Sequence, residues 1–113
     1  MRIPKDAVLL RIFLGEGDKH AGKPLYEAIV MAAREHHLAG ATVLRGPLGF
    51  GHSSRVHTAK ILRLSEDLPV VIEIVDGPER VEAFLTEIEP MIGHAGLITL
   101  EKVQVLRYGP EQN

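Results

Sequence analysis

Apolar residues in this chain recur with a period of two in some segments and with steps of three to four in others. Residues 68–75 alternate most clearly, because Val70, Ile72 and Ile74 share one face, and this pattern predicts a β-strand. Three further aliphatic runs have a similar character. Together they predict four strands, at residues 7–14, 41 to about 48, 68–75 and 97–107.

Two other segments carry apolar side chains at helical spacing. The first begins at Gly22-Lys23-Pro24, where proline suits the first turn, and is predicted to end near Gly40. The second begins at Asp76, a predicted N-cap, and ends at Gly93, with Pro90 expected to distort its last turn. The apolar faces of the two helices are Leu25, Ile29, Ala32, Ala33 and His36, and Val81, Phe84, Leu85, Ile88 and Ile92.

The order of these elements is strand, helix, strand, repeated once, with a long loop at about residues 47–68 joining the two halves. Right-handed crossovers in both halves give a four-stranded antiparallel sheet with two helices on one face. We therefore expect an α+β protein with the ferredoxin-like βαββαβ sandwich, in which residues 1–113 form a single domain. The last strand changes its apolar parity after Leu100, so a bulge is expected near Glu101 and Lys102.

The face of the sheet opposite the helices is predicted to be apolar. It would carry Val8 or Leu9, together with Val71 and Val75. An exposed apolar face of this size usually meets a partner. We expect a homo-oligomer, with a homotrimer as the leading choice.

Composition and charge narrow the class of protein. The formal net charge is -2 and the pI is about 6.3, so no basic excess indicates nucleic acid as a partner. The absence of cysteine excludes disulfides and thiolate chemistry. No apolar run reaches the roughly 18 residues of a membrane span, and the N-terminal residues do not have the pattern of a signal peptide. We expect a cytoplasmic protein without direct membrane insertion.

Two glycine-containing segments are candidates for ligand contact. Gly46-Pro47-Leu48-Gly49-Phe50-Gly51 follows the second strand, and its glycines permit positive φ and a close approach to a ligand. The spacing is neither a dinucleotide fingerprint nor a P-loop, so a simple turn stays an open alternative. Gly93-His94-Ala95-Gly96 is either a helix stop or a phosphate-binding turn. Phe50 is not expected in the core of its own subunit, and residues 56–64 fit either a strand end or a short helix.

Other candidate chemistry is sparse. Adjacent histidines such as His36 and His37 cannot chelate one ion from a helix, and no His-x-x-x-His occurs, so no metal is expected. Ser53 and Ser54 lie near His52 without a nucleophile-elbow motif, and we do not expect an enzyme. Four basic residues in or beside the long loop are either solvated or phosphate-binding: Arg45, Arg55, Lys60 and Arg63.

Several short motifs give the chain a resemblance to a known family. The chain resembles the proteins of domain-of-unknown-function family 190 (DUF190, UPF0166), which are similar to the PII signalling proteins. The resemblance covers about residues 7–109. The residues that carry it are Gly15-Glu16, Gly22-Lys23-Pro24-Leu25-Tyr26, Gly40-Ala41-Thr42-Val43, Gly49-Phe50-Gly51, His57-Thr58 and Leu64-Ser65-Glu66-Asp67-Leu68-Pro69-Val70-Val71-Ile72-Glu73.

The resemblance implies a trimer that binds an adenine nucleotide between subunits and signals through the long loop. It also suggests a membrane transporter or channel as the regulated partner. Leu97 stands where PII proteins place a phosphate-binding lysine, so AMP, ADP or a cyclic form is expected rather than ATP. The site residues implied by the resemblance are Gly49, Phe50, Gly51, His94, Gly96 and Arg107. Arg45 and Gly46, at the start of the glycine segment, complete the candidate nucleotide-binding residues.

Two alternative functions stay open. The chain could be a metal-responsive trimer like the divalent-cation tolerance proteins, which share this architecture. His52 and His57 would then matter for the response to metal. The chain could also be a structural trimer with no ligand.

Overall fold

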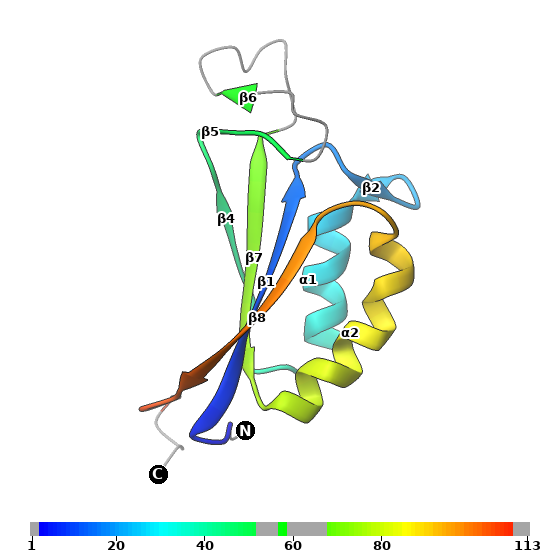
Figure 1. The fold of residues 1–113 in the computed structure, drawn as a ribbon. Helices are drawn as coiled ribbons and strands as arrows, with labels where there is room; N and C mark the ends of the chain where they lie inside the picture. The colour runs from blue at the N-terminus through cyan, green and yellow to red at the C-terminus, as the bar shows by residue number, and fades with distance from the viewer. Residues whose placement is uncertain (1–2, 52–56, 59–67, 110–113) are drawn as a thin grey trace.

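The molecule is built around one antiparallel sheet whose strands lie in the order β4–β7–β1–β8 (Figure 1). The structure, a computed structural model, describes residues 3–51, 57–58 and 68–109. The four strands are β1 (Asp6–Gly15), β4 (Thr42–Arg45), β7 (Pro69–Asp76) and β8 (Leu97–Gln104). Helices α1 (Leu25–Glu35) and α2 (Pro78–Ile92) cover one face of the sheet (Figure 1). The predicted ferredoxin-like arrangement is therefore confirmed.

The core lies between the helices and the two central strands. Burial alternates along β7, where Val70, Ile72 and Ile74 are buried and the residues between them are half-buried. β1 contributes Leu10 and Ile12 to the same face. The predicted helix faces pack against them, and the buried helix residues are Leu25, Ile29, Ala33, Val81, Phe84, Ile88 and Ile92.

Helix α1 ends earlier than Gly40, which the sequence pattern had predicted as its stop. The helix closes at Glu35, and His37 takes the left-handed conformation with φ +59°. Its N–H donates to the carbonyl of Arg34 at 3.1 Å, while the N–H of Leu38 donates to the carbonyl of Ala33 at 3.1 Å. These two bonds form a Schellman motif, which also brings the apolar Leu38 onto the core. A histidine therefore takes the role that was predicted for glycine.

A small hairpin between β1 and α1 was not predicted. Strands β2 (Lys19–His20) and β3 (Lys23–Pro24) pair around a two-residue turn. Both turn residues have positive φ, +52° at Ala21 and +81° at Gly22, as a type I′ turn requires. The helix then starts at Leu25, so Pro24 is its N-cap.

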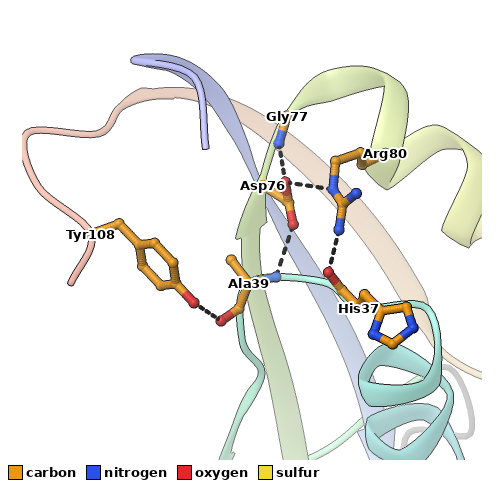
Figure 2. A network of polar contacts seen from close by, with 6 residues as sticks. All are labelled: His37, Ala39, Asp76, Gly77, Arg80 and Tyr108. Carbon is orange, nitrogen blue, oxygen red and sulfur yellow. Dashed lines mark hydrogen bonds and ion pairs between the residues drawn. The ribbon is translucent and has the colours of Figure 1, made fainter. Parts of the chain in front are cut away.

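The N-terminus of α2 also differs from the prediction, because Gly77 and not Asp76 is the N-cap. Asp76 is only 1% exposed and its carboxylate accepts three hydrogen bonds (Figure 2). The donors are the N–H of Gly77 at 2.7 Å, the N–H of Ala39 at 2.9 Å and Nε of Arg80 at 3.1 Å. Asp76 thus ties the end of β7 to the segment that follows α1.

The bulge predicted near Glu101 and Lys102 is absent, because β8 pairs with β1 in an unbroken register from Asp6↔Gln104 to Phe13↔Leu97. β8 is an edge strand with side chains on both faces. Its two half-buried residues, Ile98 and Val103, lie opposite Ile12 and Ala7 and so face opposite sides of the sheet. The change of apolar parity therefore reflects two faces and needs no extra residue.

Strand β4 stops at Arg45 instead of continuing to Leu48. A separate pair, β5 (Leu48–Gly49) with β6 (His57–Thr58), follows it. Most of residues 56–64, whose conformation the sequence left open, lie outside the described residues. Within the described part of the chain, no helix is long and apolar enough to cross a membrane.

Candidate functional site

Most of the predicted site residues gather at one end of the sheet. β4 ends at Arg45 opposite Val70, and β8 begins at Leu97 opposite Phe13, so both lie at the end where β7 begins. Figure 1 shows β5 and the turn between α2 and β8 at this same end. The strand register therefore brings the Gly46 to Gly51 segment and the His94 to Gly96 turn to one side of the molecule.

The first glycines of this segment pack against Pro69, the first residue of β7. A Cβ on Gly49 would lie 2.9 Å from Cγ of Pro69, and a Cβ on Gly46 would lie 3.0 Å from the same atom. The N–H of Gly46 also donates to the carbonyl of Pro69 at 2.8 Å. Neither glycine has positive φ, so the expectation of positive φ is wrong here. Gly49, and less tightly Gly46, therefore leave room for the Pro69 ring, which would have to shift to admit a side chain.

Gly51 and Phe50 are placed differently. A Cβ on Gly51 would meet no atom of the described residues within 4 Å. The ring of Phe50 is 67% exposed, so it does not belong to the core of its own subunit, as expected. Gly51 and Phe50 are therefore both exposed to solvent.

The second glycine turn is sterically defined. Gly96 has φ +79°, and a Cβ there would lie 2.7 Å from both the carbonyl oxygen of Phe13 and Cδ2 of Leu14. The turn begins where the N–H of Gly93 donates to the carbonyl of Glu89 at 3.0 Å. This segment therefore ends α2 at Gly93 and passes close over β1 at Gly96. His94, between these two glycines, is exposed.

Arg45, at this end of the sheet, forms an ion pair with Glu16. The guanidinium of Arg45 binds the carboxylate of Glu16, which follows the last residue of β1. The side chain of Arg45 is 55% exposed and that of Glu16 is 21% exposed. The backbone N–H of Glu16 donates to the carbonyl of Leu68 at 2.8 Å. The cation that was predicted to contact phosphate is thus already held by a carboxylate.

Arg107 does not lie at this end of the sheet. β8 runs away from the glycine turns and ends at Gln104, opposite Asp6 at the start of β1. Arg107 is exposed and lies three residues beyond that strand end. Of the predicted site residues, Arg107 alone is at the opposite end of the sheet.

The open face of the sheet carries an apolar row that crosses all four strands. Register places Leu44, Val71, Phe13 and Leu97 side by side in strand order. Three of these side chains are exposed large hydrophobic groups and Val71 is half-buried. Leu9, and not Val8, belongs to this face, because Val8 packs against the core.

A polar row lies beside the apolar one on the same face. Arg11 donates to Glu73 at 2.9 Å and to Glu101 at 3.1 Å. The hydrogen bond to Glu73 is the main cause that raises the pKa of Arg11 above its ordinary value, and desolvation opposes it. Arg11 is therefore a fixed cation in the middle of an otherwise largely apolar face.

Metal ligation has little support in the described residues. Among residues 3–51, 57–58 and 68–109, no group of three or more histidine, aspartate or glutamate side chains could hold an ion. His52 lies outside the described residues, and only the strand pairing of His57 is described.

Sequence reasoning missed two participants, Glu16 and Pro69. Glu16 was named from the sequence only within the Gly15-Glu16 motif. β1 and β4 are not neighbours in the sheet, so no local pattern joins Glu16 to Arg45. A signal for Pro69 was present, since it opens the clearest strand directly after the long loop.

Comparisons with known sequences agree with this architecture. The DUF190 family model, described as "Uncharacterized ACR", matches residues 7–105. A UPF0166 protein of Aquifex aeolicus is 43% identical over 106 residues, which span 94% of this chain and 98% of the relative.

Comparisons with solved structures show the same fold at low sequence identity. CPII of Thiomonas intermedia K12, a nitrogen regulatory PII-like protein bound to ADP, AMP and bicarbonate, superposes with a TM-score of 0.70 at 19% identity. That match covers 96% of this chain and 95% of CPII. The divalent ion tolerance protein CutA1 of Ehrlichia chaffeensis gives a TM-score of 0.56 at 10% identity, over 91% of this chain and 84% of CutA1.

Proposed function

The chain belongs to the DUF190 family, and we propose that it is a PII-like regulatory protein that binds an adenine nucleotide at a cleft between subunits. One observation carries the proposal: two glycine turns and Arg45 converge at one end of a sheet whose fold is shared with a protein bound to ADP and AMP. We infer a binding protein rather than an enzyme, since the described groups at this end of the sheet are backbone amides and a cation, which bind phosphate without chemistry.

The nucleotide would lie against the exposed backbone of Gly51 and the turn from His94 to Gly96. Backbone N–H groups in such turns are suitable donors to phosphate oxygens. Phe50 offers an exposed ring for packing against a base or a neighbouring subunit. Leu97 supplies no charge, so AMP, ADP or a cyclic nucleotide suits this site better than ATP.

Assembly into a homotrimer would complete the site. The apolar row of Leu44, Val71, Phe13 and Leu97 is the surface that we assign to subunit contact, because a row spanning the whole sheet is costly to leave in water. Arg107 lies far from the glycine turns of its own subunit. It would therefore reach a nucleotide only from a neighbouring subunit.

Signalling would use the loop at about residues 47–68, whose first residues, including Gly49 and Gly51, belong to the proposed site. A ligand shifts a conformational equilibrium only through differential affinity for the two states. A nucleotide that contacts the first residues of the loop would have such a preference. The regulated partner suggested by the family resemblance is a membrane transporter or channel, which a cytoplasmic trimer would meet from inside the cell.

A metal-responsive protein is the second candidate, and the fold shared with CutA1 is the observation that favours it. Zinc or copper would then raise the melting temperature of the protein, whereas nucleotides would not.

A thermal-shift series with AMP, ADP, ATP, cyclic AMP and cyclic di-AMP tests the proposal. A ligand present at 100 times its dissociation constant stabilises the folded state by about 2.7 kcal/mol. We expect a shift with at least one of these nucleotides. No shift with any of them, together with a shift on adding zinc or copper, would favour the second candidate.

A further inference from the structure

Glu16 contacts both ends of the segment that carries the glycine turn. Its carboxylate binds the guanidinium of Arg45, which directly precedes Gly46. Its backbone N–H donates to the carbonyl of Leu68, which directly precedes β7. A single residue at the end of β1 thus joins the residue before the glycine segment to the residue before β7.

An anion that approaches Arg45 would meet the negative charge of Glu16 as well as the positive charge of Arg45. Arg45 is 55% exposed, so its guanidinium is within reach of solvent, yet one carboxylate already occupies it. Glu16 is less exposed, at 21%, and is held in place by its backbone bond. A phosphate group that approaches Arg45 therefore meets a fixed negative charge at the same place.

We propose that Glu16 is a specificity-determining residue that competes with nucleotide phosphate for Arg45. This inference rests on the proposed nucleotide site. A bound phosphate would have to displace the Glu16 carboxylate, or accept its repulsion, before it paired with Arg45. The repulsion grows with the number of phosphate charges, since each added charge interacts unfavourably with the same carboxylate. Glu16 would thereby favour nucleotides with few phosphate charges.

Displacement would have a second consequence at the base of the segment. When Arg45 binds a phosphate instead of Glu16, the ion pair is lost. Only the backbone hydrogen bond from Glu16 to Leu68 remains. Glu16 would then hold both Arg45 and Leu68 when the site is empty, and Leu68 alone when the site is occupied. A bond that forms in one state and is broken in the other is what couples a ligand to a conformational equilibrium.

The sign of one substitution separates this role from a purely structural one. Glu16→Gln keeps the shape of the side chain and removes its charge. If Glu16 competes with phosphate, the variant binds nucleotides more tightly, by about twofold for AMP and about fivefold for ATP, the size expected for one exposed charge interaction. If Glu16 only positions Arg45, the variant binds them more weakly. Glu82→Gln is the matched control, because Glu82 is exposed in the first half of α2 and the change in net charge is the same.

Isothermal titration calorimetry with AMP, ADP and ATP decides whether Glu16 competes with phosphate. The proteins to compare are the wild type, Glu16→Gln, Glu82→Gln, Arg45→Gln and the double variant at positions 16 and 45. The expected result is a gain in Glu16→Gln that rises with phosphate number, is absent in Glu82→Gln and disappears when Arg45 is also replaced. Equal gains for all three nucleotides, a loss of affinity, or a gain that survives the Arg45 substitution would overturn the role of Glu16.

The same titrations separate this inference from the proposed function. Binding by the wild-type protein with no change in Glu16→Gln retains the proposed function and overturns the role of Glu16. Binding by Glu16→Gln alone supports the competition and contradicts a nucleotide role for the native chain. No binding by either protein overturns both, because the removal of the competing charge should have exposed Arg45.

Discussion

A Cβ atom on Gly96 would lie 2.7 Å from the carbonyl oxygen of Phe13, closer than a side chain can approach a backbone atom without displacement. The turn between α2 and β8 therefore passes directly over the last residues of β1. Its backbone also has φ +79°, which L-amino acids rarely adopt. The second glycine turn of the proposed site is thus fixed by two independent constraints.

Gly96→Ala should destabilise the protein by about 3 kcal/mol, because it adds a clash to the strain of a left-handed residue. Gly22→Ala is the control, since Gly22 has φ +81° but a Cβ there would meet no atom within 4 Å. Its cost should be about 1 kcal/mol. Urea denaturation of both variants measures the difference, and equal costs would show that the contact with Phe13 relaxes freely.

The buried carboxylate of Asp76 should be the most sensitive polar group near the other end of the sheet. Asp76→Ala removes the acceptor for the N–H groups of Ala39 and Gly77 and for Arg80, and we expect a cost of about 3 kcal/mol. Asp6→Ala, at an exposed carboxylate, should cost less than about 0.5 kcal/mol. Equal denaturant midpoints for Asp76→Ala and Asp6→Ala would refute a structural role for the network in Figure 2.

Phe13→Asp should dissociate the proposed homotrimer, because it places a charge in the middle of the apolar row. Met31→Asp is the control, since Met31 is also an exposed large hydrophobic residue but lies on α1. Sedimentation velocity should show a trimer for the wild-type protein and for Met31→Asp, and a smaller species for Phe13→Asp. A monomeric wild-type protein, or a Phe13→Asp variant that remains a trimer, would remove this face from the interface.

Strong periodicity was enough to predict the strands and helices that build the core. Alternation in β7 and the stripes on α1 and α2 are set by burial, and burial is what the hydrophobic pattern encodes. The order of elements then left few topologies, because crossover connections are right-handed.

The predictions that were wrong concern positions where one local rule was overridden. Glycine is the usual stop of a helix, but the Schellman bonds around His37 ended α1 before the chain reached Gly40. Asp76 had the right type and place for an N-cap, yet its carboxylate turned to Ala39, a contact 37 residues away in sequence. Long-range partners of this kind have no local signature.

The candidate site was predicted only in part for the same reason. The glycine turns were visible as sequence motifs, whereas the pairing of Arg45 with Glu16 joins strands that are not neighbours. For Arg107, the strand predicted at residues 97–107 already implied separation from the His94 to Gly96 turn by the length of a strand, and the structure agrees.

Calorimetric titration of Gly51→Val with AMP and ADP tests the nucleotide site most directly. A Cβ at Gly51 meets no atom of the described residues within 4 Å, so we expect the substitution to leave the sheet and its core intact. Gly40→Val is the control, since Gly40 is equally open but lies near the other end of the sheet. We predict that the wild-type protein and Gly40→Val bind one of these nucleotides with the same affinity, while Gly51→Val loses at least about tenfold, or about 1.4 kcal/mol. Equal affinity in all three proteins would contradict a site at the glycine turn.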